Sequence, residues 1–263
     1  FYQKISTPVL TDLELDFGEI VTYDMYPNPL PDLFAGNQVV VVGRYHEGGI
    51  TDIKLRGLVN NQTNVFEYQN ERFLECGQLE KDTMSLLPRL WATRKVGYLL
   101  NKIRLEGRQV EIVEQVVKLS IRYGIVTPYT SYLVTEPMPI GEENIDAIAD
   151  EVLRESLAAP ESVSGQSAVE KAAEEGELSQ AQVSPSLLTN SAKVVKLVGS
   201  RTYVLTSLPI NGNKSIWVDT AFDPLSMDPI PVAFLSDDYF ALARLSTDIG
   251  SALALDPYVI VLI

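Results

Sequence analysis

Cysteine and histidine are almost absent from this sequence: Cys76 and His46 are the only residues of these types among 263. One cysteine cannot form an intrachain disulfide, which excludes a small disulfide-stabilised secreted module. One cysteine and one histidine cannot assemble a zinc site either. No apolar run reaches the roughly 18 residues that a membrane-spanning helix needs. We therefore expect a chain without disulfides, without zinc and without a membrane span.

Common catalytic motifs are missing too. The sequence contains no P-loop, no G-x-G-x-x-G and no G-x-S-x-G. A catalytic His46 would need a nucleophile or a carboxylate partner, and a nucleophilic Cys76 would need a nearby histidine. We interpret His46 as a solvated loop residue and Cys76 as a free thiol. Five aspartates lack the spacing of a calcium-binding EF-hand, and two of them precede prolines as turn residues do: Asp219, Asp223, Asp228, Asp237 and Asp238. We expect no catalytic, cofactor or metal site in this chain.

Positive charge is scarce, since the formal net charge is −14. Nucleic acids and anionic membranes require clustered Lys and Arg, so neither is an expected partner. Twelve acidic residues lie between 136 and 177 against Arg154 and Lys171, so this segment carries −10 of the total. Its second half is rich in Ala, Glu, Ser and Gln and has no aromatic residue. We predict a flexible acidic linker over 137–190, with a helix in its first part through Ile145, Ile148, Val152 and Leu153.

The first part of the chain carries β patterns. Residues 9–17 and 53–59 alternate apolar and polar side chains, as half-buried strands do. Asn60-Asn61 is typical of a tight turn into a returning strand at 64–68. The run Val39–Val42 predicts a strand that is covered on both faces. Short strands at this spacing indicate a β-sandwich.

Residues 86–123 show helical spacing instead. Pro88 is acceptable in a first helical turn, and Trp91 lies in the apolar stripe that follows. Gly107 is expected to end the first helix, and Gly124 to end the second in a left-handed conformation. The second helix carries two apolar stripes, which predicts burial over a wide face.

The last part of the chain predicts a small mixed module. Residues 194–208 have the pattern of a β-hairpin, and 216–218 that of a third strand. Ser236, followed by two aspartates, is a strong helix N-cap. The apolar run 258–263 predicts a buried final strand.

These patterns predict an α+β fold class with four parts. A β-sandwich followed by a two-helix hairpin occupies 9–136, the acidic linker 137–190, and the small α+β C-terminal module 191–263. Residues 1–8 precede the first strand. Because the first residue is Phe1 and no leader sequence precedes it, we expect a portion of a longer protein.

Three stretches carry a family resemblance: Phe1-Tyr2-Gln3-Lys4-Ile5-Ser6-Thr7-Pro8-Val9-Leu10-Thr11-Asp12, Phe34-Ala35-Gly36-Asn37-Gln38-Val39-Val40-Val41-Val42-Gly43-Arg44, and Tyr123-Gly124-Ile125-Val126-Thr127-Pro128-Tyr129-Thr130-Ser131-Tyr132-Leu133-Val134-Thr135. In this order they resemble the inter-alpha-trypsin inhibitor heavy chain family, in the part that follows its von Willebrand factor type A domain. The second resembles the family's F-x-G-x-x-hydrophobic-G stretch, and the third its F-V-T-P-x-T-S motif. Together they cover about half of the chain.

The resemblance implies a non-enzymatic scaffold. Family members pair a VIT domain with an A domain that binds Mg²⁺ or Ca²⁺ through an Asp-x-Ser-x-Ser motif. That motif is absent here, so the resemblance places the metal upstream of Phe1 and gives this chain no cofactor of its own. The implied partners are the VIT and A domains of the same protein and further copies of the chain. The implied location is extracellular or at the cell surface, and the low cysteine content and the C-terminal module favour a bacterial member.

The resemblance also implies that residues 1–8 end the last helix of the A domain and connect it to the first strand. The residues implied in this structural coupling are Phe1, Tyr2, Ile5, Pro8, Gly36, Gly43, Trp91, Tyr123, Gly124, Thr127, Pro128, Thr130 and Ser131. Two other hypotheses remain open. The C-terminal module could hold a hydrolase or another enzyme, tested through Asp219 and Asp237, or the acidic linker could be a processing site.

Overall fold

The computed structural model describes residues 8–75, 87–130, 195–199, 201–207 and 215–263, together with single positions between 146 and 178. The chain divides into two compact units, Phe1–Glu80 and Lys81–Ile263. Phe1, Tyr2 and Ile5 lie outside the described residues, as do Cys76, Ser131 and most of the acidic segment. The predicted domain boundaries therefore stay predictions.

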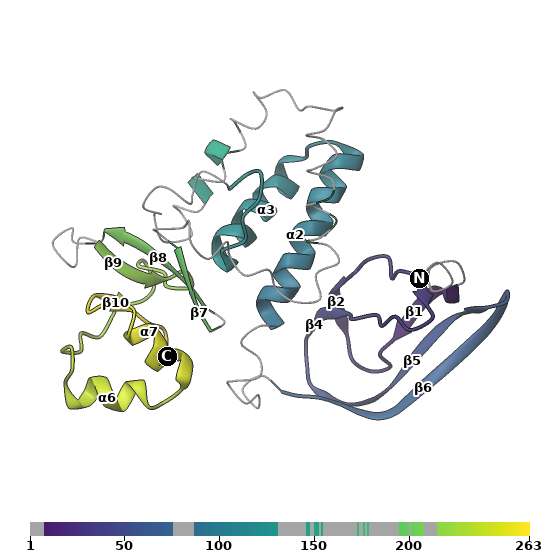
Figure 1. Ribbon diagram of the computed structural model, residues 1–263, viewed down its shortest axis with the longest axis horizontal. Helices are drawn as coiled ribbons and strands as arrows, with labels where there is room; N and C mark the ends of the chain where they lie inside the picture. The colour runs from purple at the N-terminus through teal and green to yellow at the C-terminus, as the bar shows by residue number, and fades with distance from the viewer. Residues whose placement is uncertain are drawn as a thin grey trace. The chain divides into compact units, whose positions relative to one another are not determined.

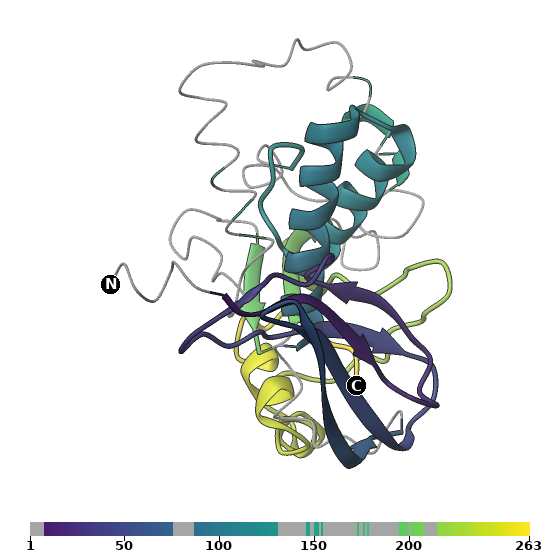
Figure 2. The ribbon, with the colours of Figure 1, turned by 90° about the vertical axis from the view of Figure 1, so that its right-hand side faces the viewer.

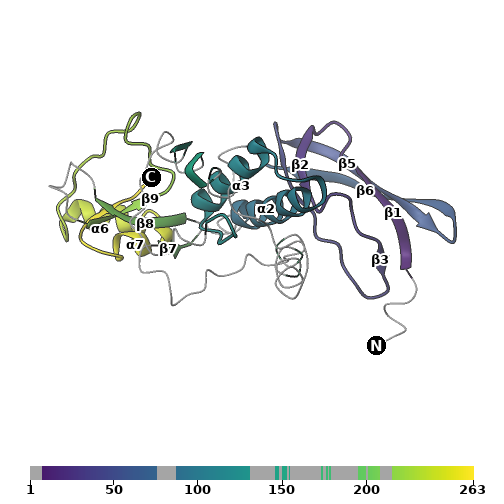
Figure 3. The same ribbon diagram turned by 90° about the horizontal axis from the view of Figure 1, so that it is seen from above.

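The first unit is built from six strands (Figure 1): β1 (Pro8–Asp16), β2 (Thr22–Tyr26), β3 (Leu33–Phe34), β4 (Val42–Tyr45), β5 (Gly49–Val59) and β6 (Gln62–Phe73). Four of them form a curled antiparallel sheet in the order β3-β1-β5-β6, seen with its long strands β5 and β6 in Figure 3, and β2 pairs with β4 in a separate ribbon. The sequence predicted a sandwich; the described strands form a sheet of four and a ribbon of two.

The β5–β6 hairpin turns as the sequence predicts. Val59 pairs with Gln62, so the loop consists of Asn60 and Asn61 alone. Both have left-handed backbone angles, with φ of 51° and 62°. A two-residue turn with both φ values positive matches the right-handed twist of the strands, and asparagine tolerates that conformation better than other side chains do.

The predicted strand Val39–Val42 is wrong in its extent and its burial. Only Val42 belongs to β4, and Val39–Val41 are irregular and half-buried. The valines favour a strand, but among the described strands β4 pairs with β2 alone, so it belongs to a two-stranded ribbon and not to the inside of a sheet.

The two predicted helices are confirmed as α2 (Leu87–Glu106) and α3 (Val110–Tyr123), which pack side by side (Figure 2). Pro88 lies in the first turn of α2, and Gly107 follows its last residue with φ 90°. The side chains of α2 are buried on nearly every side, among them Trp91, Val96 and Leu100. α3 buries one wide face through Val113, Val116 and Val117, all 0% exposed.

The C-terminal module combines a mixed sheet with two short helices: β7 (Val195–Val198), β8 (Arg201–Ser207), β9 (Ser215–Asp219), α6 (Asp237–Ala243), α7 (Thr247–Leu253) and β10 (Val259–Ile260). The strand order is β10-β9-β8-β7, with β10 parallel to β9 and the other pairs antiparallel. A core of Val198, Tyr203, Trp217 and Ala252 lies inside it. The α+β class is therefore confirmed.

Two local predictions for this module have different outcomes. Ser236 caps α6 as expected, because its hydroxyl accepts a hydrogen bond from the Tyr239 N–H at 3.2 Å. A final strand is present with Ile260 buried, but the extent expected over 258–263 is wrong: β10 contains only Val259 and Ile260, and Ile263 is 67% exposed. Only Trp217 and Val218 of β9 pair with it, so the remaining apolar residues have no strand to join.

Within the acidic segment, the described positions Asp146, Ala147, Asp150, Glu151, Val152 and Arg154 are helical. Val152 is only 4% exposed, as an amphipathic helix requires. No helix in the described part of the chain has both the length and the apolarity to cross a bilayer.

Candidate functional site

Helix α3 ends at Tyr123, where the chain turns sharply. We call this end of the helix and the turn after it, up to Thr130, the corner. Gly124 has φ 61° and ψ 40°, and its N–H donates to the Ile121 carbonyl at 3.3 Å. The next N–H, of Ile125, donates to the Ser120 carbonyl at 2.9 Å. These two bonds satisfy carbonyls that the end of a helix would otherwise leave without partners.

A compact turn follows, and it contains the T-P-Y-T part of the stretch that resembles the heavy-chain motif. The Thr130 N–H donates to the Thr127 carbonyl at 3.0 Å, and the Thr127 N–H donates back to the Thr130 hydroxyl at 3.0 Å. The two hydroxyls lie 2.8 Å apart, and the Thr130 hydroxyl also reaches the Ile125 carbonyl at 3.3 Å. Thr127 and Thr130 are buried at 3% and 4% exposure, while Pro128 is exposed at the tip.

This corner brings together parts that are distant in sequence. The rings of Tyr123 and Trp91 of α2 meet edge to face, 6.4 Å between centroids. The Thr220 hydroxyl, just after β9, donates to the Arg122 carbonyl at 2.8 Å. The corner thus connects α2, α3 and the C-terminal sheet through hydrogen bonds and ring packing. Its buried polar groups include the hydroxyls of Ser120, Thr127 and Thr130 and backbone atoms, which suit it to fixing geometry more than to proton transfer.

The predicted coupling residues of the first unit are placed in its turns and edges. The backbone of Pro8 pairs with Phe34 across β1 and β3. Gly36, with φ 80°, lies in the turn closed by the bond from the Asn37 N–H to the Phe34 carbonyl at 3.0 Å. Gly43 lies in β4 against Met25, where an added Cβ would come within 1.9 Å of the Met25 sulfur.

One face of the four-stranded sheet is apolar. The register places Leu15 opposite Leu55 and Leu55 opposite Phe66, so the three side chains form one row across β1, β5 and β6. Ile53 and Tyr68 form a second row on this face. We call these five residues the open face, because Phe66 and Tyr68 remain 45% and 50% exposed.

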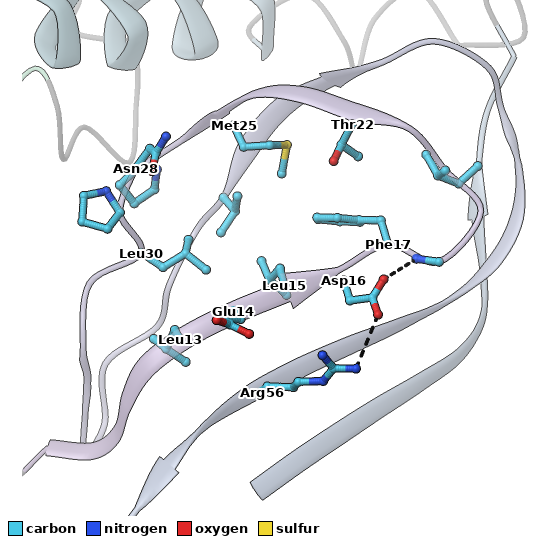
Figure 4. Close-up of a pocket in the computed structure, with 15 residues that line it drawn as sticks. Leu13, Glu14, Leu15, Asp16, Phe17, Thr22, Met25, Asn28, Leu30 and Arg56 are labelled. Atoms are coloured by element: carbon cyan, nitrogen blue, oxygen red, sulfur yellow. Dashed lines mark hydrogen bonds and ion pairs between the residues drawn. The ribbon is translucent and has the colours of Figure 1, made fainter. Parts of the chain in front are cut away.

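A pocket of about 690 Å³ adjoins the open face between β1 and the chain around Pro27–Leu30 (Figure 4). Leu15, Phe17, Met25 and Leu30 surround it. In the described part of this unit only three large apolar side chains are fully buried, Leu10, Leu13 and Tyr26. Among the residues described for this unit, none form the second layer that folds of this kind usually have.

The opposite face of the sheet is charged. Asp16, Lys54 and Glu67 form its middle row. Lys54 lies 3.5 Å from Glu67, and Arg56 lies 3.7 Å from Asp16. These pairs are about half exposed, and pairs of this kind contribute little to stability. The charged face therefore belongs in solvent, and the open face is the side that can receive another layer.

His46 and the C-terminal aspartates occupy sites without catalytic geometry. The His46 ring stacks on Tyr23 at 4.7 Å in an exposed loop. Asp223 closes a turn, and the hydrogen bond from the Ser226 hydroxyl, followed by that from the Leu225 N–H, lowers its pKa. Asp237 and Asp238 are exposed in the first turn of α6. In the residues that the structure describes, no three metal-binding side chains come together.

Asp219 is the exception, because it is buried and ion-paired. Its carboxylate accepts from the Arg201 guanidinium at 3.0 Å and from the Ala221 N–H at 3.0 Å, and it is 2% exposed. Arg201 also donates to the Leu262 carbonyl. The Tyr203 hydroxyl is buried beside this pair without a hydrogen bond of good geometry, and burial, followed by the charge of Asp219, raises its pKa. The pair joins β8, β9 and the chain end, and sequence analysis missed Arg201.

Two arginines of α2 were also missed. Arg89 and Arg94 are 6% and 3% exposed, and burial lowers the pKa of both, that of Arg89 to about 10. Within the described part of the chain, the Arg89 Nε has no hydrogen-bond partner. Their spacing places both arginines on the apolar stripe of the helix, and this is the signal in the sequence that indicates their burial.

Comparison with known proteins adds the family relation. Heavy chain H3 of inter-alpha-trypsin inhibitor from Rattus norvegicus is 32% identical over 171 residues, 60% of this chain. The Homo sapiens heavy chains H3 and H4 are 31% and 26% identical over 170 and 144 residues, 61% and 52% of this chain. The chain is a distant homologue of the inter-alpha-trypsin inhibitor heavy chains. It spans 18% of the length of both H3 proteins and 16% of H4.

The predicted resemblance to the heavy chains is thus confirmed as distant homology. No family model matches the chain, and no solved structure matches it. Of the coupling residues, the corner unites six: Trp91, Tyr123, Gly124, Thr127, Pro128 and Thr130. Pro8, Gly36 and Gly43 belong to the other unit.

Proposed function

We propose that the chain is a non-enzymatic scaffold of a secreted or cell-surface protein of the heavy-chain type. In this proposal it follows a von Willebrand factor type A domain and supports the metal-dependent adhesion or assembly that this domain carries out. The partners are the VIT and A domains of the same protein and, in assemblies, further copies of the chain. Mg²⁺ or Ca²⁺ binds in the A domain, and the single cysteine favours a bacterial member. The homology to heavy chains is the observation that carries the proposal.

The open face supports the scaffold role. Half-exposed Phe66 and Tyr68, together with Leu15 and Leu55, offer apolar surface on a sheet whose other face is charged. Burying a large aromatic or aliphatic side chain yields about 1.5–3 kcal/mol. In the proposal a neighbouring domain covers this face, and β1 transmits its movement because β1 carries Leu15 and lies directly after the first seven residues.

The corner supports the second requirement of a scaffold, which is a fixed arrangement of its elements. A scaffold must hold its elements in one arrangement, and the corner does this with backbone bonds, threonine hydroxyls and the Trp91–Tyr123 contact. The hydrogen bonds within the Thr127–Thr130 turn join threonine hydroxyls and backbone atoms, which suits a part that fixes geometry.

Hydrogen exchange on the whole protein, with Mg²⁺ and after its removal, tests the proposal. We expect exchange in β1 and β6 to change with the metal, because coupling to the A domain runs through Pro8–Leu15 and the open face. Peptides from β9 in the other unit are the internal control and should change much less. Equal exchange in β1 under both conditions would refute coupling.

The enzymatic alternative has a separate test. Asp219 is held by Arg201 in a buried ion pair, which does not suit a general base that must gain a proton. The variants Asp219→Asn and Asp237→Asn in a hydrolase substrate screen should leave any background rate unchanged. A turnover that one of them abolishes would favour the enzyme.

A further inference from the structure

The C-terminal module exposes an unusual amount of apolar surface. Six large side chains between β9 and α7 have exposures from 44% to 87%: Leu225, Ile230, Phe234, Leu235, Phe240 and Leu245. We call these six residues the C-terminal apolar surface. Single exposed apolar residues are ordinary, whereas a contiguous exposed apolar patch marks an interaction site.

The surface is held in an ordered form. Tyr239 fixes α6 to α7, because its hydroxyl donates to the Leu253 carbonyl at 3.1 Å. Its ring contacts those of Phe234 and Phe240, each at a centroid distance of 5.3 Å. The two phenylalanines therefore belong to one cluster around an anchored tyrosine. Yet no residue of α6 is buried.

The backbone conformation of Leu235 also favours an interaction at this surface. Its φ is 61°, a left-handed conformation that bulky apolar residues rarely adopt. Ser236 caps α6 directly after it, so the start of the helix fixes this geometry. The result is a leucine 57% exposed beside Phe234. A strained residue that presents an apolar side chain to solvent is more easily explained by a contact with a partner than by stability of the module.

The charges around the surface are mostly negative. Residues 215–263 contain seven aspartates, and Arg244 is their one basic residue. Asp223, Asp228, Asp237 and Asp238 alternate with the apolar residues along the chain. Pairing two copies through this surface would bring like charges together, and an anionic membrane would be repelled.

We propose that the C-terminal apolar surface docks a protein whose contact face has an apolar centre and a rim of Lys and Arg side chains. The apolar centre packs on Phe234, Leu235 and Phe240, and the rim meets Asp237 and Asp238. This interaction is independent of the scaffold role proposed above, since it uses neither the open face nor a metal.

The test uses the whole chain and two helical peptides with identical leucine faces, one with lysines and one with glutamates on the polar face. Fluorescence anisotropy should show binding of the Leu/Lys peptide, weakened by salt, and no binding of the Leu/Glu peptide. Ile230→Ser and Phe240→Ser should each weaken binding at least about tenfold, as interface anchors do. Asp237→Asn with Asp238→Asn should weaken it and reduce its salt dependence.

Matched controls lie on the other unit. Val65→Ser and Glu71→Gln alter an exposed apolar and an exposed acidic residue of β6 and should leave the affinity unchanged. Circular dichroism of each variant checks that both units, including the sheet that carries the controls, are folded. The proposal is overturned by equal binding of both peptides, by no binding of the Leu/Lys peptide, or by controls as damaging as the surface variants. It is also overturned by a dimer that Phe240→Ser dissolves, or by partition of the chain onto zwitterionic vesicles that Phe240→Ser prevents.

Discussion

The Thr127–Thr130 turn offers the sharpest test of how the corner is held. Replacing Thr130 by valine keeps the shape of the side chain but removes its hydroxyl. That hydroxyl accepts from the Thr127 N–H at 3.0 Å, lies 2.8 Å from the Thr127 hydroxyl and reaches the Ile125 carbonyl at 3.3 Å. Thr130→Val therefore leaves a buried N–H and a buried hydroxyl without their partner.

The magnitude follows from burial. Thr127 is 3% exposed, so water cannot replace the lost bonds without opening the turn. An unsatisfied buried donor costs about 1–3 kcal/mol, and a lost hydrogen bond between neutral groups about 1 kcal/mol. We expect Thr130→Val to lower the free energy of unfolding by roughly 2–4 kcal/mol. That is a large part of the 5–15 kcal/mol typical of a domain.

Urea unfolding followed by circular dichroism at the helical band measures this effect, because α2 and α3 are the longest helices described. Thr130→Ser is the matched control: it keeps the hydroxyl and loses one buried methyl group, worth about 0.8 kcal/mol. If valine proves as stable as serine at this position, the hydrogen bonds do not hold the corner and the reasoning fails.

Variants at three further sites test other contacts. Gly124→Ala should cost about 1–2 kcal/mol, since φ is 61°, and Gly124→Asn less; equal losses would contradict the left-handed cap. Arg201→Leu leaves the charge of Asp219 buried and should cost about 3–5 kcal/mol in urea unfolding, whereas adding Asp219→Asn should recover part of it; no recovery would contradict a buried ion pair. Asp146, followed by Glu114, raises the pKa of Lys118. The interaction of Lys118 with these two carboxylates therefore stabilises the fold at pH values below the lysine pKa of about 10.5 in the unfolded chain. This stabilisation is lost as the pH rises through the higher pKa of Lys118 in the folded chain. Lys118→Gln should speed hydrogen exchange around residue 146 at neutral pH, Lys118→Arg should not, and equal rates would refute the contact.

Local structure was the part that the sequence could predict. Asn60-Asn61, Gly107, Gly124 and Ser236 each determine a turn or a helix end through their own backbone or side chain, so neighbouring residues suffice to predict them. Their structures agree with the expectation because no distant contact competes with these preferences.

The sequence could not predict how far each strand extends, because that depends on its pairing partner. The four valines at 39–42 and the apolar tail at 258–263 both favour strands, yet a strand extends only as far as its neighbour does. β2 accepts Val42 but not Val39–Val41, and β9 accepts only Val259 and Ile260. Composition reports the preference for a strand and says nothing of how long the neighbouring strand is.

The site shows the same division. The resemblance to a heavy-chain motif drew attention to Thr127 and Thr130, because the resembling stretch and the turn occupy the same few positions. The Arg201–Asp219 pair was not found, since it depends on the register of β8 and β9. That register pairs Tyr203 with Asp219, which puts Arg201 diagonally across from the carboxylate on the same face. Polar residues that end apolar strands, as Asp219 does, are the signal that could have suggested a partner.

The two exposed apolar surfaces differ in their charges, and this difference separates their roles. Lys54–Glu67 and Arg56–Asp16 place both signs on the sheet that carries the open face, so a domain covering that face gains little from net attraction. The C-terminal apolar surface has aspartates around it and one arginine. Raising the salt from about 0.1 M to about 1 M shortens the screening length from about 10 Å to about 3 Å. Protection of β6 in the whole protein should then change little, while binding of the Leu/Lys peptide should weaken strongly. A strong salt effect on β6 would mean that charge, and not the row of Leu55 and Phe66, holds the neighbouring domain.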